Sequence, residues 1–368
     1  MFKKLQLSML GAAMLAGMPN VMTAQTAPDE VVLMGNVINF IGEEGMYSTD
    51  LGIYSFNADP SGASSFTAVY KSHLMYSNSG AINAKDRFYS FYSRFDDFDD
   101  LTPCIIVRTY NNETWELIEK KEYPVNSGLE SYDMCYSPSD DKYYGIFKSL
   151  VQGDDETSDE DDYDETRLGT IDLNTMEITY ISQEPLPNLI YGLAASPEGD
   201  IYGILPVDVQ TGKGALVKFD KTNGTYSVVG SLGFKTQFRR MSATIDQRTG
   251  KMYWVGYIND GIDPETGTHS RDYNKVALYE VNLTTGAAVK IYDMPYKCVI
   301  SGLYVKDGDR NLTGIGTISA ESLNKDAVAN IYSTNGQLVF TGKAADAQLQ
   351  RGIYIIRQGE NACKMIVR

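Results

Sequence analysis

The stretch SYDMCYSPSDDKYYGIF (Ser131–Phe147) joins a short apolar strand, a turn rich in Ser, Pro and Asp, and a tyrosine-rich strand. Variants of this phrase begin at Ser79, Ile190 and Arg240, so it recurs about every 50 to 60 residues. Each copy is followed by two alternating strands around a tight turn, for example KTNG (Lys221–Gly224). Four strands per unit at this period are typical of a β-propeller blade.

Incomplete copies at both ends of the repeat region predict the number of blades. The inner strand VISGLYV (Val299–Val305) has no outer strands after it. The N-terminal region supplies three strands without an inner partner, at Val31–Phe40, Leu51–Asn57 and Ser65–Lys71. Pairing these pieces gives one blade and removes the open edge of the ring. The sequence therefore predicts an all-β, five-bladed propeller over residues 25–306, with six blades as the alternative if the N-terminal region holds another inner strand.

The first 24 residues have the features of a Sec signal peptide. Lys3 and Lys4 precede the apolar run Leu7–Met18, and small residues near Ala24 offer a cleavage site. The apolar run is too short to serve as a transmembrane anchor. No cysteine lies near the cleavage point, which argues against a lipid anchor there. We expect an exported protein without a transmembrane anchor.

The chain is acidic, and this limits its partners. Its formal net charge is −16, which becomes −18 once Lys3 and Lys4 leave with the signal peptide. Nucleic acids and anionic membranes select basic surfaces, so neither is an expected partner. The charge favours cations, basic proteins or neutral ligands.

The four cysteines are widely separated in the sequence, at Cys104, Cys135, Cys298 and Cys363. Their spacing matches neither a zinc motif nor a dense disulfide framework. We expect buried thiols in strands, with one disulfide between propeller strands as the alternative in an exported protein.

Loop lengths distinguish the two faces of the predicted propeller. All inner strands start at one face, so the loops between second and third strands gather there; we call this the long-loop face. These loops are long and variable, whereas the turns of the opposite face are short. Because long loops on a rigid scaffold commonly carry function, the long-loop face is the predicted binding surface. The four long loops are residues 94–103, 149–167, 206–214 and 259–275.

The long loops are rich in acids. Nine of the twelve residues in Asp154–Glu165 are acidic. Such loops are commonly solvated, because like charges repel. A weak calcium site and the recognition of a basic partner are alternatives, although no loop has the spacing of a preorganised calcium loop. The calcium candidates are Asp96, Asp97, Asp99, Asp260 and Asp263, and no other cofactor is expected.

Five residues near the starts of inner strands are candidates for ligand binding. Arg239 and Arg240 could together bind a carboxylate or sulfate, or could balance the nearby acids. Tyr132, Asp133 and Tyr191 combine rings with a polar group, which suits sugar faces. Ordinary packing of the tyrosines is the alternative, because the chain holds 26 of them.

Catalytic motifs are scarce. The chain has two histidines, His73 and His269, and lacks the G-x-S-x-G, H-E-x-x-H and C-x-x-C motifs. We therefore predict a non-catalytic binding module for a protein or glycan. The alternative is a carbohydrate- or peptide-directed hydrolase or lyase that uses carboxylates near the propeller axis.

The C-terminal region differs in composition from the repeats. Residues 307–326 are polar and predict a linker. Three segments follow: IYSTNGQLV (Ile331–Val339), RGIYIIR (Arg351–Arg357) and KMIVR (Lys364–Arg368). Together, over residues 327–368, they resemble the C-terminal sorting domain (type A-like) of the type IX secretion system of Bacteroidetes. The resemblance implies a small β-sandwich, the type IX machinery as a partner, and a secreted or outer-membrane cell-surface location.

Overall fold

The computed structural model describes most of the repeat region and part of the C-terminal region. The described ranges are 30–40, 50–94, 103–148, 165–208, 210–236, 241–258, 275–294, 298–306, 328–333, 336–343, 346–347, 349, 352–358 and 361–367. The chain divides into two compact units, one formed by Glu30–Asp309 and one containing Arg310–Arg368.

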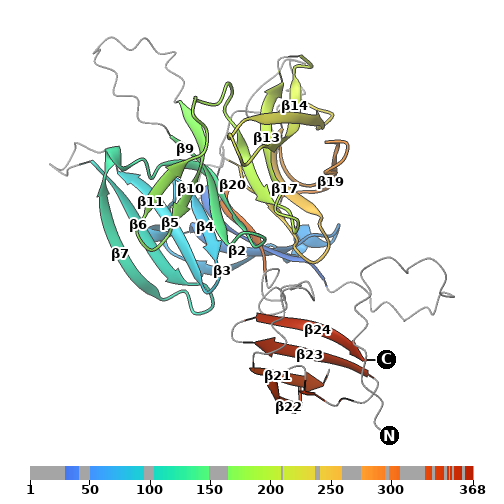
Figure 1. The fold of residues 1–368 in the computed structure, drawn as a ribbon. Helices are drawn as coiled ribbons and strands as arrows, with labels where there is room; N and C mark the ends of the chain where they lie inside the picture. The colour runs from blue at the N-terminus through green and yellow to red at the C-terminus, as the bar shows by residue number, and fades with distance from the viewer. Residues whose placement is uncertain are drawn as a thin grey trace, which may run out of the picture. The chain divides into compact units, whose positions relative to one another are not determined.

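Four of the sheets in the first unit are formed by consecutive strands, each pairing antiparallel with the next (Figure 1). Blade 1 is β4 (Ala81–Ala84), β5 (Arg87–Arg94), β6 (Cys104–Asn111) and β7 (Leu117–Pro124). Blade 2 is β8 (Ser131–Ser137), β9 (Lys142–Lys148), β10 (Thr166–Asp172) and β11 (Glu177–Tyr180). Blade 3 is β12 (Tyr191–Ala195), β13 (Ile201–Asp208), β14 (Lys213–Phe219) and β15 (Tyr226–Ser231). Blade 4 is β16 (Ala243–Ile245), β17 (Met252–Ile258), β18 (Lys275–Val281) and β19 (Ala288–Asp293).

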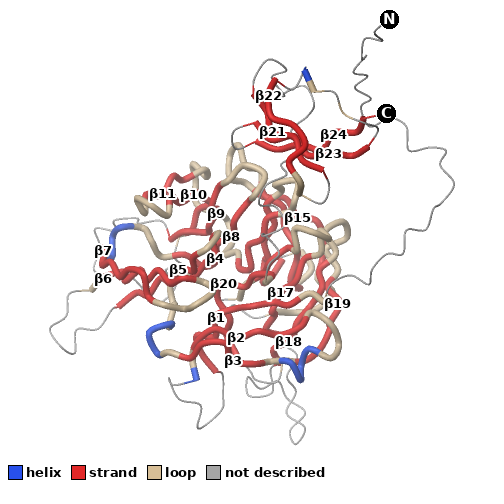
Figure 2. Tube along the Cα trace, turned by 90° about the horizontal axis from the view of Figure 1, so that it is seen from below, coloured by secondary structure: helices blue, strands red, loops and turns tan. Residues whose placement is uncertain are grey.

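Blade 5 combines strands from both ends of the unit. Its order is β20 (Cys298–Val305), β1 (Val32–Phe40), β2 (Gly52–Asn57) and β3 (Thr67–Lys71). In Figure 2, β20 lies beside β1, and the backbone N–H of Lys306 donates to the carbonyl of Val32 at 2.8 Å. The predicted five-bladed propeller is confirmed. The described part of the N-terminal region contributes three outer strands to this blade, and holds no additional inner strand of the kind that six blades would require.

The hydrophobic core lies between neighbouring blades. Phe91 and Ile105 of blade 1 share one buried cluster with Met134 and Phe147 of blade 2. Similar clusters join blade 2 to blade 3 and blade 5 to blade 1, and the largest unites blades 3, 4 and 5. The strands alternate side chains between two faces, and both faces of most blades are covered by a neighbour. Each blade therefore depends on its neighbours for burial of its apolar surface.

The prediction of buried thiols is confirmed for the three cysteines that the structure describes in the propeller. Cys104, Cys135 and Cys298 are buried and not in disulfides. Burial raises the pKa of Cys298 to about 12 and raises that of Cys135 well above its usual range. Neither thiol therefore supplies a thiolate nucleophile at neutral pH.

The second unit contains one four-stranded antiparallel sheet, in the order β22-β21-β23-β24. Its strands are β21 (Val328–Ser333), β22 (Leu338–Lys343), β23 (Gly352–Gln358) and β24 (Asn361–Val367). The predicted strand-turn-strand at Ile331–Val339 corresponds to β21 and the start of β22. The second sheet of a sandwich is not among the described residues. Over the same described ranges, no helix is long and apolar enough to cross a membrane.

Candidate functional site

The inner strands bring one buried carboxyl group to the centre of the ring. Asp133, on β8, is 1% exposed. One carboxylate oxygen accepts a hydrogen bond from the backbone N–H of Leu193 at 2.8 Å and a long one from that of Ala243 at 3.4 Å. The hydroxyl of Ser242 lies 3.0 and 3.2 Å from the two carboxylate oxygens. Asp133 therefore links blade 2 directly to blades 3 and 4.

Ser242 extends this network to blade 5. Its hydroxyl oxygen accepts a hydrogen bond from the backbone N–H of Leu303, on β20, at 3.0 Å. The donating N–H groups belong to the residues that directly follow Gly192, Ser242 and Gly302, so these three residues hold places equivalent to Asp133. Gly192 and Gly302 have φ angles of +64° and +62°, and a Cβ on Gly302 would lie 2.9 Å from the Cβ of Ala81. The close approach of Ala81 and the positive φ angle therefore favour glycine at position 302.

The environment of Asp133 favours its neutral form. Burial raises the pKa of this carboxyl group to about 8, and hydrogen bonds from Ser242 and from the backbone of Leu193 partly oppose the rise. A carboxyl group taken out of water resists ionisation unless its charge is compensated. The observed contacts of Asp133 hold the ring together, and its predicted role in ligand binding stays a prediction.

The structure brings two other candidates, Tyr132 and Tyr191, together beside this network. Their ring centroids lie 5.4 Å apart in an edge-to-face arrangement, with Tyr191 only 6% exposed. This packing between blades 2 and 3 uses much of the Tyr191 ring, whereas Tyr132 is half-buried. Arg239 and Arg240 lie outside the described residues, and their predicted anion binding stays a prediction.

The predicted calcium candidates also lie outside the described residues. They are Asp96, Asp97, Asp99, Asp260 and Asp263. Over the part of the chain that the structure describes, no group of three or more His, Cys, Asp or Glu residues could hold a metal ion.

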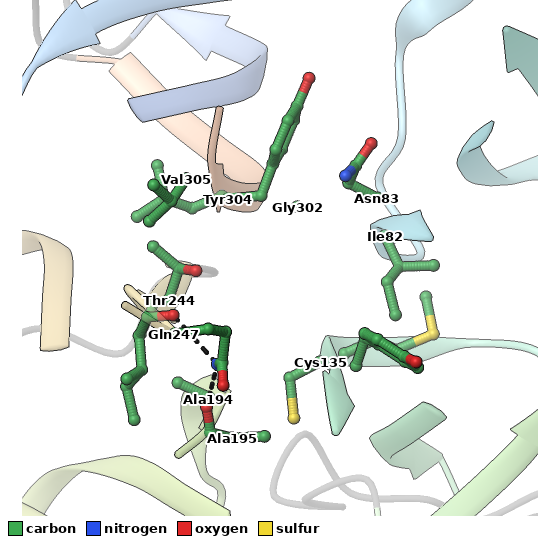
Figure 3. Close-up of a pocket in the computed structure, with 15 residues that line it drawn as sticks. Ile82, Asn83, Cys135, Ala194, Ala195, Thr244, Gln247, Gly302, Tyr304 and Val305 are labelled. Carbon is green, nitrogen blue, oxygen red and sulfur yellow. Dashed lines mark hydrogen bonds between the residues drawn. The ribbon is translucent and has the colours of Figure 1, made fainter. Parts of the chain in front are cut away.

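A small cavity lies at the other end of the inner strands. Figure 3 shows side chains from all five blades around it, including Asn83, Cys135, Ala194, Thr244 and Tyr304. Its volume is about 40 Å³, enough for a few water molecules and too small for a sugar ring.

Gln247 supplies a polar group to the wall of this cavity. Its amide nitrogen donates to the carbonyls of Ala195 at 2.7 Å and Ile245 at 3.1 Å, the contacts dashed in Figure 3. Its amide oxygen is buried without a hydrogen-bond partner. A buried, unpaired amide oxygen beside a water-sized space indicates a position for an ordered water. Sequence reasoning missed Gln247, because it stands in a short turn with no distinguishing motif.

Comparisons with known proteins do not assign an activity. No protein-family model matches the chain, and no curated protein matches it. Similar solved structures include a putative 6-phosphogluconolactonase from Bacteroides fragilis. It is 12% identical over 77% of this chain and 99% of that chain, with a TM-score of 0.40. A GH43 β-xylosidase/α-arabinofuranosidase from a compost microbial metagenome is 13% identical over 72% of this chain and 91% of that chain, with a TM-score of 0.41. A chain of a nidogen/laminin complex is 10% identical over 75% of this chain and 97% of that chain, with a TM-score of 0.39.

Proposed function

We propose that this protein is an exported, non-catalytic binding protein that recognises a protein or glycan through its long-loop face. The main support for the proposal is that the central carboxyl group is buried and hydrogen-bonded within the ring. Asp133 is the one acidic residue within the inner strands β4, β8, β12, β16 and β20, and its contacts are internal hydrogen bonds.

An acid that directly follows an inner strand is also engaged. Asp246, directly after β16, is 0% exposed and accepts hydrogen bonds from Arg248 Nε at 2.9 Å and from the Arg248 guanidinium at 3.1 Å. A glycosidase-type mechanism needs two carboxyl groups that face a substrate. Neither Asp133 nor Asp246 meets this requirement, which favours binding over hydrolysis.

Binding can be tested with the mature protein on an array of glycans and proteins, with calcium and with EDTA. A variant in which Asp154–Glu165 is replaced by a Gly-Ser segment of equal length tests the long-loop face. We expect the variant to lose binding while its melting temperature is unchanged. Turnover of a carbohydrate or peptide substrate by the intact protein, abolished in Asp133→Asn, would favour the hydrolase or lyase alternative.

Export through the type IX system is a further part of the proposal, supported by the signal-peptide features and by the resemblance of residues 327–368. In a host with this system, we expect the full chain on the cell surface or in the medium. A chain that ends at residue 326 should remain in the periplasm. The full chain in a host that lacks the system is the matched control. Equal surface exposure of both chains would contradict this part.

A further inference from the structure

A second concave surface lies between blades 1 and 2. It is formed by the β4–β5 turn, the β8–β9 turn and the β10–β11 hairpin, all on the face opposite the long loops, which we call the turn face. Its volume of about 590 Å³ falls within the range of small-ligand sites. The residues that carry the argument are Lys85, Arg87, Asp141, Tyr143 and Asn174. We call this surface the blade 1–2 groove.

The rim of the groove is held by an ion pair between the two blades. Lys85 Nζ lies 3.1 Å from Asp141 Oδ1, which also accepts a hydrogen bond from the Tyr136 hydroxyl at 2.8 Å. Lys85 and Asp141 have φ angles of +56° and +51°. Side chains other than glycine are disfavoured in this left-handed region, by about 1 to 2 kcal/mol. Trp115 and Met176, in hairpins of the same two blades, have similar φ angles of +60° and +61°, so the left-handed residue belongs to the turn geometry of the repeat. In the first turns of blades 1 and 2 this geometry brings the two charged side chains together at the rim.

A tyrosine behind the rim of the groove also reaches the axial cavity. Tyr136, which bonds Asp141 on the rim, also lines the small axial cavity. Its ring packs against that of Tyr143, with centroids 5.1 Å apart. Tyr136 therefore connects Asp141, at the rim of the groove, to the wall of the axial cavity.

The chemistry of the lining favours a neutral, hydroxyl-rich ligand. Lys85 is paired with Asp141, and Arg87 lies 3.9 Å from Asp86. The lining holds three basic residues (Lys85, Arg87, Lys142) and four acidic ones (Asp86, Asp141, Asp172, Glu177), so it offers no net positive charge to an anion. Paired charged groups, amides and hydroxyls are preoriented hydrogen-bond partners, and tyrosine rings can pack on sugar C–H faces. An apolar segment would find few matching contacts.

We propose that the blade 1–2 groove binds a neutral oligosaccharide. The groove lies on the opposite face from the long loops, so this site does not depend on the recognition surface proposed above.

The test uses the full mature protein and a panel of neutral xylo-, manno-, cello- and chito-oligosaccharides, from tetra- to hexasaccharides, measured by calorimetry and saturation-transfer NMR. The main variant is Lys85→Gly with Asp141→Gly, which removes both rim side chains at positions where glycine is favoured. We expect at least one oligosaccharide to bind, and binding to weaken at least tenfold in this variant. Asn174→Ala is a second variant, should the first lose thermal stability.

The matched control is Lys251→Ala with Glu280→Ala, which removes an ion pair of similar exposure and 3.0 Å length on blade 4 and should leave binding unchanged. Replacement of Asp154–Glu165 should also leave it unchanged, which separates this site from the long-loop face. The proposal is overturned if no oligosaccharide in the panel binds, if binding persists in the groove variants, or if the groove instead binds charged peptides.

Discussion

The two ends of the inner strands differ in how deeply they bury an aspartate side chain. At their starts, Asp133 is 1% exposed and links three blades through hydrogen bonds. Just beyond their ends, Asp141 has a side chain that is 63% exposed and pairs with a lysine that is 60% exposed. The first carboxyl group is a structural element of the ring, whereas the second is a surface group that joins two neighbouring turns. The comparison shows that burial and hydrogen-bond partners, and not distance from the propeller axis, decide the role of an acidic residue in this protein.

Removal of the central carboxyl group should have the largest effect. In Asp133→Ala, the backbone N–H groups of Leu193 and Ala243 and the Ser242 hydroxyl lose their acceptor inside the core. We expect the free energy of unfolding to fall by on the order of 3 to 5 kcal/mol, since each buried donor left unpaired costs about 1 to 3 kcal/mol. The free energy of unfolding is measured by urea denaturation, monitored by tyrosine and tryptophan fluorescence. A loss below about 1 kcal/mol would show that the network contributes little, on the scale of a single net hydrogen bond.

The pH dependence of stability should follow the raised pKa of Asp133. Its value of about 8 in the folded protein stands above the ordinary 3.8. The stabilising contribution is therefore complete below pH 4 and is lost as the pH rises through 8. Relative to Asp133→Asn, the wild type should lose about 2 kcal/mol of unfolding free energy between pH 6 and 7.5, at about 1.4 kcal/mol per pH unit. An opposite slope would mean that the hydrogen bonds outweigh burial.

Ser242→Ala should have an intermediate effect, because it removes the link from Asp133 to Leu303. We expect a loss of about 1 to 2 kcal/mol, in the range for leaving a buried donor unpaired. Ser90→Ala is the matched control, because Ser90 is 0% exposed but its hydroxyl has no hydrogen-bond partner. Equal losses in the two variants, measured by urea denaturation, would contradict a special role for Ser242.

The smallest effect is expected at the turn face. Lys85→Gly removes an exposed ion pair, worth less than about 1 kcal/mol, and relieves a left-handed backbone at a non-glycine residue. We expect an unfolding free energy within about 1 kcal/mol of the wild type, because relief of the left-handed backbone offsets the lost ion pair. Differential scanning calorimetry of the variant and the wild type measures this difference in unfolding free energy. A large loss would mean that the Lys85–Asp141 pair holds blades 1 and 2 together.

The sequence was sufficient to predict the blades. Tyrosine-rich strands and short Asp, Gly and Pro turns recur about every 50 to 60 residues, and pairing the incomplete copies at Val31–Lys71 and Val299–Val305 favoured five blades over six. These are local patterns with a period of two, which the chain shows directly. The buried thiols of Cys104, Cys135 and Cys298 were predicted from a spacing that matches neither a zinc motif nor a dense disulfide framework.

The role of Asp133 was harder to predict, because it depends on contacts between residues 60 to 110 positions apart. Beside two tyrosines, its sequence suggests a ligand site as readily as a structural one. One signal was present: the residues at equivalent places in neighbouring inner strands are Gly192, Ser242 and Gly302, so Asp133 has the one carboxyl group among these four residues. The groove was missed because its residues stand in short turns that carry no motif.

Blade 5 has a consequence for the order in which the protein can fold. Its inner strand, β20, pairs with β1 across nearly the whole length of the unit, for example Val305 with Leu33. Until β20 is available, β1 has an unpaired edge and the ring cannot close. Contacts between such distant segments form late, because the loop entropy must be overcome first. We expect ring closure to be the slow step of folding, so a chain in which β20 has not yet been synthesised should keep an open ring.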